Sequence, residues 1–202
     1  MKLYFSAGAC SLSPHIVLRE AGIPFELAAV DLRSKRLADG SDFRAINPKG
    51  YVPALQLDDG QLLTEGPAIV QYVADSKPES KLAPPAGTFE RYRLQEWLTY
   101  IGTEIHKTYS TFFNPSATDE MRSPAREHLS TRLDFVAKEL EAKPFLLGDT
   151  FTVADAYLYT VLRWSQFAGI DLSKWPSIQA FVERVSERPA VKQALEAEKL
   201  KK

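Results

Sequence analysis

The hydrophobic pattern changes near residue 80, and this change constrains the fold more than any other feature of the chain. Residues 1–77 alternate between strand-like and helical runs, whereas the apolar runs after residue 88 all have the 3.6-residue period of a helix. The segment between them contains Pro78, Pro84, Pro85 and Gly87, which interrupt regular structure. The sequence therefore predicts an α/β domain over residues 1–77, a linker over 78–88 and an all-helical domain over 89–202.

The first domain reads as βαβ followed by ββα. Asp59-Gly60, between two apolar runs, is a strong hairpin signal. We expect strands at Lys2–Phe5, Phe25–Asp31, Pro53–Leu57 and Gln61–Thr64, and helices at Ser13–Ala21 and Pro67–Asp75. In the second domain we expect helices at Phe89–Phe113, Pro124–Ala142, Val153–Ala168, Pro176–Glu187 and Ala190–Glu198.

The composition is that of an ordinary globular protein. Of 202 residues, 45% are hydrophobic and 25% are charged, and the formal net charge is -1. Such a balance gives no general attraction to nucleic acid or to an anionic membrane. We see no targeting signal and no membrane span, and the single cysteine excludes an internal disulfide. We therefore expect a cytoplasmic protein that binds neither nucleic acid nor membrane.

Cys10 is the strongest candidate for a reactive group. It lies between the first strand and the first helix, where free backbone N–H groups and the helix dipole favour a thiolate. The alternative is a buried structural cysteine, which is common among free cysteines. The motif from Cys10 to Ser13 is C-x-x-S, so no second cysteine can resolve a mixed disulfide. Redox turnover would then need a small thiol from solution, which points to glutathione.

Two further motifs suit a peptide-like ligand. Val52-Pro53 either opens a strand or, if its peptide bond is cis, presents the Val52 backbone to a ligand. At Thr64–Pro67 a helix begins, where the Gly66 N–H suits a carboxylate and Glu65 suits an ammonium group. A plain helix start explains Thr64–Pro67 equally well.

Four segments in register resemble a bacterial glutathione transferase of the beta class, and the resemblance covers essentially the whole chain. They are GACSLSPHIVLREAG (8–22), NPKGYVPAL (47–55), LLTEGPAIVQYVAD (62–75) and FTVADAYLYTVLRW (151–164). The resemblance implies a thioredoxin-like N-terminal domain, an all-helical C-terminal domain and a homodimer. It implies glutathione as co-substrate, and we expect no metal.

The resemblance also implies roles for individual residues. Cys10 would lie beside the glutathione sulfur, Val52-Pro53 would be a cis bond contacting the cysteinyl backbone, and Lys35 would pair with the glycyl carboxylate. Glu65 and Gly66 would hold the γ-glutamyl end. The helical domain would contribute Thr99, Thr103, Glu104, Ile105 and His106. Family members often have Asn in place of Thr99, a difference that bears on the glutathione contact there. Many have Tyr in place of Phe5, and because Phe has no hydroxyl to assist the sulfur, activation shifts onto Cys10, Ser11 and His106.

Helical spacing supports part of this assignment. Thr99, Thr103, His106 and Ser110 fall on one face of the predicted helix over 89–113. A histidine there donates to a thiolate or relays a proton. Ser11 either donates to the Cys10 thiolate or only caps the first helix. We take Cys10, His106 and Ser11 as the catalytic candidates.

Aromatic side chains are candidates for binding a second, apolar electrophile. They are Tyr109, Phe112, Phe113, Trp164 and Phe167. An aromatic core between helices is an equally good interpretation of any one of them. The function expected is conjugation of glutathione to hydrophobic electrophiles, including dehalogenation, together with thiol–disulfide exchange through Cys10. The alternative is a non-catalytic binding module that reuses the fold.

Overall fold

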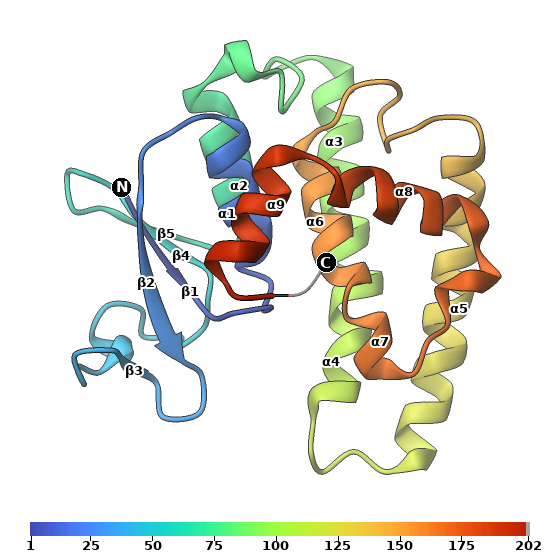
Figure 1. The fold of residues 1–202 in the computed structure, drawn as a ribbon, viewed down its shortest axis with the longest axis horizontal. Coiled ribbons are helices and arrows are strands. Elements are labelled where there is room, and N and C mark those ends of the chain that lie inside the picture. Colours follow the sequence, from blue (N-terminus) through green and yellow to red (C-terminus); the bar gives the residue numbers. More distant parts are fainter. Residues whose placement is uncertain (201–202) are drawn as a thin grey trace. The chain divides into compact units, whose positions relative to one another are not determined.

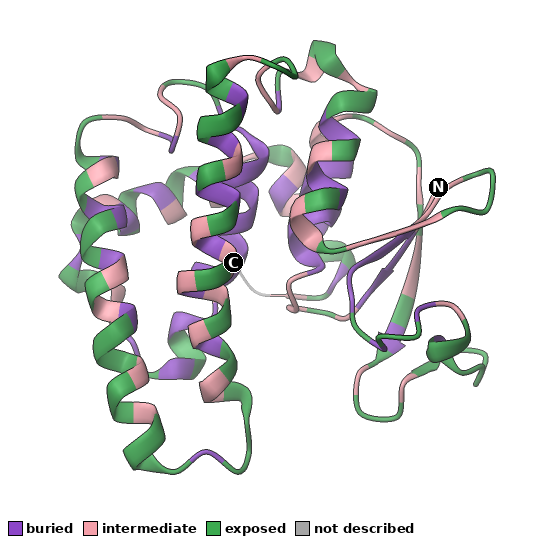
Figure 2. Cartoon of the chain, turned by 180° about the vertical axis from the view of Figure 1, so that it is seen from behind, coloured by how far each residue is buried: buried purple, intermediate pink, exposed green. Residues whose placement is uncertain are grey.

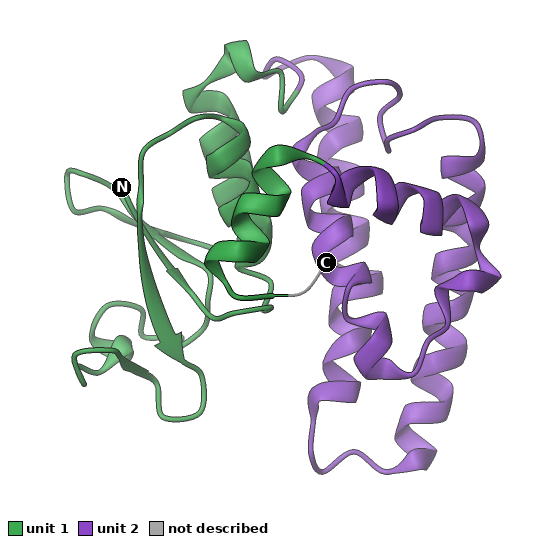
Figure 3. Cartoon of the chain, viewed as in Figure 1, with its two compact units in different colours: residues 1–83, 188–202 green, residues 84–187 purple. Residues whose placement is uncertain are grey.

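The computed structural model describes residues 1–200, and the predictions made for residues 201–202 lie outside them. Two compact units form (Figure 3). One comprises residues 1–83 together with the C-terminal segment from Arg188, and the other comprises Pro84–Glu187. The C-terminal boundary therefore differs from the expected one, because the last helix, α9 (Pro189–Ala197), packs against α1 (Leu12–Glu20) of the first unit.

The first unit is built on a mixed sheet of strand order β3-β2-β1-β4-β5 (Figure 1). Its strands are β1 (Lys2–Phe5), β2 (Glu26–Asp31), β3 (Arg36–Leu37), β4 (Ala54–Gln56) and β5 (Leu62–Thr64). β1 pairs parallel with β2 and antiparallel with β4, as the βαβ and ββα order requires. α1 packs against both α2 (Gly66–Ser76) and α9. The predicted strands and helices are confirmed, while β3 was not predicted.

Side chains of β1 alternate between the two faces of the sheet. Tyr4 packs in a buried cluster with Phe43 of η1 (Phe43–Ala45), Val30, Val52 and Ala54. Leu3 and Phe5 point to the opposite face, as the period of two requires, and both are buried. The Phe5 ring lies 6.3 Å from the His15 ring of α1.

The second unit consists of helices. After the short η2 (Pro78–Ser80) of the first unit, they are α3 (Phe89–Tyr100), η3 (Ile101–His106), α4 (Lys107–Phe113), α5 (Asp119–Glu141), α6 (Val153–Leu162), α7 (Ser165–Ala168), η4 (Leu172–Lys174) and α8 (Pro176–Ser186). Every residue of α6 is buried, whereas α5 buries one stripe that includes Leu129, Leu133 and Leu140 (Figure 2). No described helix is long and apolar enough to cross a membrane.

Three helical predictions need correction. The expected helix over 89–113 is interrupted by η3, a π-helical segment, which the 3.6-residue pattern does not reveal. Pro124 does not open a helix but lies inside α5, whose N-cap is Thr118. The expected helix over 153–168 is two helices, α6 and α7. A capping box at Thr152 and Asp155 fixes the start of α6.

Candidate active site

The loop between β1 and α1 is closed by Ser11. The Ser11 hydroxyl accepts a hydrogen bond from the Ser6 N–H at 3.1 Å and donates one to the Ser6 carbonyl oxygen at 3.2 Å. Its single hydrogen is thus already used, and the residue is fully buried. Ser11 also makes no side-chain cap to α1. The structure therefore contradicts the capping role expected of Ser11, and in the free chain its hydroxyl fixes the loop that carries Cys10.

Cys10 contacts the segment with the cis peptide bond. Its thiol donates a hydrogen bond to the Val52 carbonyl oxygen at 3.2 Å, and the Val52-Pro53 bond is cis. Burial of the thiol raises the pKa of Cys10 to about 11, against the smaller opposing effect of its own backbone N–H. In the free chain Cys10 is therefore a thiol at neutral pH, and the expected helix-induced thiolate is wrong for this state.

The start of α2 lies beside Pro53. A Cβ added at Gly66 would meet the Pro53 ring at 3.9 Å, an ordinary contact. Glu65 is close enough to Cys10 for its negative charge to contribute to the raised pKa of the thiol. The structure thus brings Cys10, the cis bond and the Glu65-Gly66 helix start into one cluster, as the sequence predicted.

Glu65 is held in an unusual backbone conformation. It is the N-cap of α2 with a positive φ of 72°, and its carbonyl accepts the N–H groups of Ala68 and Ile69. Its exposed carboxylate pairs with the Lys49 ammonium group at 2.5 Å. In the free chain the Glu65 carboxylate thus already pairs with a cation.

Lys35 contacts the segment that precedes Val52. Its ammonium group donates to the Gly50 carbonyl at 3.0 Å and lies 5.7 Å from the centre of the Tyr51 ring. Lys35 also has a positive φ, of 59°, and its backbone carbonyl accepts from the Phe43 N–H. Lys35 thus places a cation at Gly50, two residues before Val52, which fits its expected role toward a carboxylate.

Sequence reasoning missed Glu198. Its carboxylate, fully buried, accepts the Gly8 N–H at 2.9 Å and lies 2.8 Å from His15 Nδ1. Arg19 donates its Nε–H to His15 Nε2 at 2.9 Å, so His15 carries its proton on Nδ1 and donates it to Glu198. No sequence signal distinguishes Glu198 from the other charged residues of the C-terminal run. Its partners His15 and Gly8 are 183 and 190 residues away.

In the second unit, His106 lies at the end of η3. Its Nδ1 is 2.5 Å from the Tyr157 hydroxyl, and its ring stands edge-on to Trp164 with centres 4.9 Å apart. Burial lowers the pKa of His106 to about 4, so the ring is neutral at pH 7. His106 is thus suited to hydrogen bonding and does not supply a positive charge.

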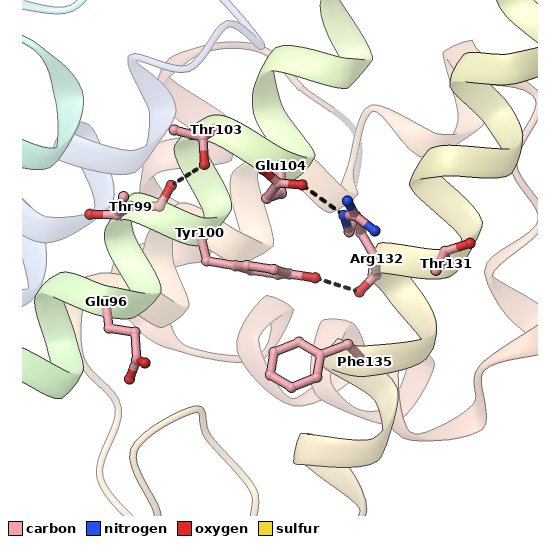
Figure 4. A pocket seen from close by; sticks show the side chains of 8 residues that line it. All are labelled: Glu96, Thr99, Tyr100, Thr103, Glu104, Thr131, Arg132 and Phe135. Carbon is pink, nitrogen blue, oxygen red and sulfur yellow. Dashed lines mark hydrogen bonds and ion pairs between the residues drawn. The ribbon is translucent and has the colours of Figure 1, made fainter.

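The other helical candidates have different neighbours from His106. Thr99, Thr103 and Glu104 line an open pocket of about 770 Å³ between α3–η3 and α5 (Figure 4). Glu104 pairs there with Arg132 at 2.7 Å, which lowers the pKa of that carboxyl group. Thr103, Glu104 and His106 all lie in the π-helical segment η3, whose wider turn departs from the helical spacing used in the prediction. Ile105 is fully buried, and its side chain belongs to the core.

The aromatic candidates divide into core and surface. Tyr109 is fully buried with its hydroxyl 2.5 Å from Ser165 Oγ, so it belongs to the core and does not line an open pocket. Phe113 is half-exposed and packs edge-on against Trp164, which also contacts His106. Phe167 is 68% exposed. Trp164 and Phe113 beside His106 remain the best candidates for an apolar subsite.

Comparison with known proteins identifies the family. Residues 7–76 match the glutathione S-transferase N-terminal domain and residues 100–189 match the glutathione S-transferase C-terminal domain. The chain is 49% identical to "Glutathione S-transferase GstA" of Escherichia coli O157:H7, covering all of both chains.

Solved structures of similar proteins support the same family. "Ternary complex of BphK, a bacterial GST" has a TM-score of 0.98 and 60% identity, covering 99% of this chain and 100% of that one. A sphingomonad glutathione S-transferase solved with glutathione has a TM-score of 0.96 and 46% identity over the full length of both chains. With its thioredoxin-like domain, helical domain and Cys10 cluster, this chain belongs to the glutathione S-transferase family.

Proposed function

We propose that this chain is a beta-class glutathione transferase that uses Cys10 both to exchange disulfides with glutathione and to support its conjugation to apolar electrophiles. The observation that carries the proposal is the contact of the Cys10 thiol with the cis Val52-Pro53 segment, beside the start of α2. A thiol, backbone hydrogen-bonding groups and paired charges at one place match the chemistry of a small zwitterionic thiol peptide.

The residues around Cys10 fit glutathione in a defined direction. Glu65 offers a carboxylate to the γ-glutamyl ammonium, and the N-terminus of α2 at Gly66 suits the adjacent carboxylate. Val52 offers backbone groups to the cysteinyl unit, and Lys35 a cation to the glycyl carboxylate. The resemblance adds Thr99, Thr103, Glu104 and His106, of which His106 is assigned to the sulfur.

Disulfide exchange at Cys10 balances without a further oxidant. The Cys10 thiolate attacks the glutathione sulfur of a mixed disulfide between glutathione and a small thiol, a Cys10–glutathione disulfide forms, and the small thiolate leaves and takes up a proton. A glutathione thiolate then attacks the glutathione sulfur of the Cys10–glutathione disulfide, so that oxidised glutathione is released and Cys10 is regenerated. In conjugation, the glutathione thiolate forms a carbon–sulfur bond and the leaving group, such as a halide, departs with its electron pair.

We further propose a cytoplasmic homodimer. Large apolar side chains are exposed on α3 and α5, namely Phe89, Tyr92 and Phe135, and Phe135 also lines the open pocket together with Tyr100 and Arg132. Exposed apolar surface of this kind is typical of a protein–protein contact. Light scattering at several concentrations tests the dimer, and a monomer at micromolar concentration contradicts it.

Steady-state kinetics with two substrates test the activity. Wild type is expected to conjugate glutathione to an aryl chloride activated by nitro groups and to reduce a small mixed disulfide of glutathione. Cys10→Ser removes the thiol with little change in size, so the exchange activity should disappear while glutathione binding persists. Absence of both activities in wild type contradicts the proposed enzyme.

A further inference from the structure

His106 ends a π-helical segment and is held from two sides. η3 contacts α6, where Tyr157 is 4% exposed and places its hydroxyl 2.5 Å from His106 Nδ1. The edge of Trp164 closes a second side of the ring. Gly102, one helical turn earlier, also lies beside the Tyr157 hydroxyl, since a Cβ there would meet its oxygen at 3.6 Å, an ordinary contact. π-helical turns often occur at functional sites.

The hydrogen bond between Tyr157 and His106 has a preferred direction. An imidazole nitrogen is a much stronger base than a phenol oxygen, and a phenol O–H is the better acid, so the short contact is O–H···Nδ1. A neutral imidazole carries one hydrogen. If Nδ1 accepts, that hydrogen lies on Nε2.

We propose that Tyr157 is a positioning residue that holds His106 as the Nε2–H tautomer, so that His106 acts in the reaction as a hydrogen-bond donor and not as a general base. The inference rests on the proposed function in assigning His106 to the glutathione sulfur. It resolves the two roles that the sequence left open for His106. A neutral donor stabilises a thiolate without taking the proton that the thiolate has lost.

Nitrogen-15 NMR of histidine-labelled free protein tests the tautomer directly. The chain has three histidines, so His106→Gln assigns the signals of His106 by their disappearance. In wild type we expect the chemical shift of a protonated Nε2 and an unprotonated Nδ1. In Tyr157→Phe the two nitrogens should move toward averaged values. A protonated Nδ1 in wild type, or unchanged His106 signals in Tyr157→Phe, overturns the proposal.

Kinetics separate positioning from a purely structural role. Tyr157→Phe should lower kcat for conjugation about fivefold, the worth of one hydrogen bond, with KM for glutathione changed less than about twofold. Tyr159→Phe is the matched control, because it removes a buried α6 hydroxyl that bonds to Arg163 and not to His106. Equal loss of kcat in the two variants overturns the positioning role.

A conservative variant distinguishes a donor from a base. The amide N–H of His106→Gln reaches near the position of Nε2, so this variant should keep more activity than His106→Ala. Equal inactivity of the two variants overturns the donor role. Because the NMR experiment uses free protein, an inactive wild type with the expected tautomer contradicts the proposed function while supporting the Tyr157–His106 bond.

Discussion

The thiol of Cys10 donates its hydrogen bond to the carbonyl oxygen of Val52, 3.2 Å away. The two residues are 42 positions apart, and they meet because β1 pairs with β4. In the free enzyme the Cys10 thiol thus donates to the Val52 backbone, which we also assign to glutathione binding. Because a carbonyl oxygen can accept two hydrogen bonds, we expect bound glutathione either to share this carbonyl with the Cys10 thiol or to take it over.

The reactivity of Cys10 in the free enzyme should rise with pH over the whole neutral range. Burial raises the pKa of the thiol to about 11, so the thiolate fraction grows about tenfold per pH unit below that value. Alkylation by iodoacetamide, followed by mass spectrometry from pH 6 to 10, measures this rise. A plateau of the rate below about pH 8 contradicts it. Since Cys10 is the single cysteine, every adduct reports on it.

Ser11→Ala should weaken the fold without changing how Cys10 titrates. The variant loses the two hydrogen bonds between the hydroxyl and Ser6, which costs about 1–3 kcal/mol of unfolding free energy because the Ser6 groups are left unpaired. Urea unfolding measures the loss, and alkylation measures the thiol. A shift of the alkylation profile by a whole pH unit contradicts the geometry described for Ser11.

Glu198→Ala should destabilise the first unit by about 3 kcal/mol. The substitution leaves the buried Nδ1–H of His15 and the Gly8 N–H without their carboxylate acceptor. Glu196→Ala is the matched control, because Glu196 is an exposed carboxylate in the same C-terminal segment. This variant should change the free energy of unfolding by less than about 0.5 kcal/mol, the usual limit for an exposed site. Equal unfolding midpoints for the two variants are inconsistent with the Glu198 contacts.

Glu65→Gln should weaken glutathione binding about tenfold and leave kcat for conjugation nearly unchanged. A charge-assisted bond to an ammonium group is worth more than a neutral one, and this bond is the same before and during the chemical step. Glu26→Gln serves as control, since Glu26 is an exposed carboxylate of the same unit that also pairs with a lysine. Calorimetric titration gives the dissociation constants. Unaltered affinity in Glu65→Gln refutes the γ-glutamyl assignment.

The fold was largely predictable because its signals are local. The local sequence is enough to predict a strand, a helix, the Asp59-Gly60 turn or the linker, because each signal spans only a few neighbouring residues. The placement of α9 was not predictable, because it depends on the contact of Glu198 with Gly8 and His15. The π-helical segment η3 was not predicted either, because its sequence fits a continuous α-helix equally well.

The sequence predicted which residues come together at Cys10 better than it predicted their hydrogen-bond partners. Cys10, Val52-Pro53 and Glu65-Gly66 come together as expected, because each lies at the end of a strand or the start of a helix. The direction of the Ser11 hydroxyl was open, since Ser6 and Cys10 are both near in sequence and only the folded loop selects one. The burial of Tyr109 likewise depends on its partner Ser165, 56 residues away.

Intact-mass spectrometry after exposure to oxidised glutathione tests the central claim most directly. At mildly alkaline pH, wild type is expected to gain the mass of one glutathione less two hydrogens, and excess reduced glutathione should remove it. Cys10→Ser should gain nothing. An unmodified wild type, or an equal adduct on Cys10→Ser, would contradict the claim that Cys10 is a glutathione-exchanging thiol.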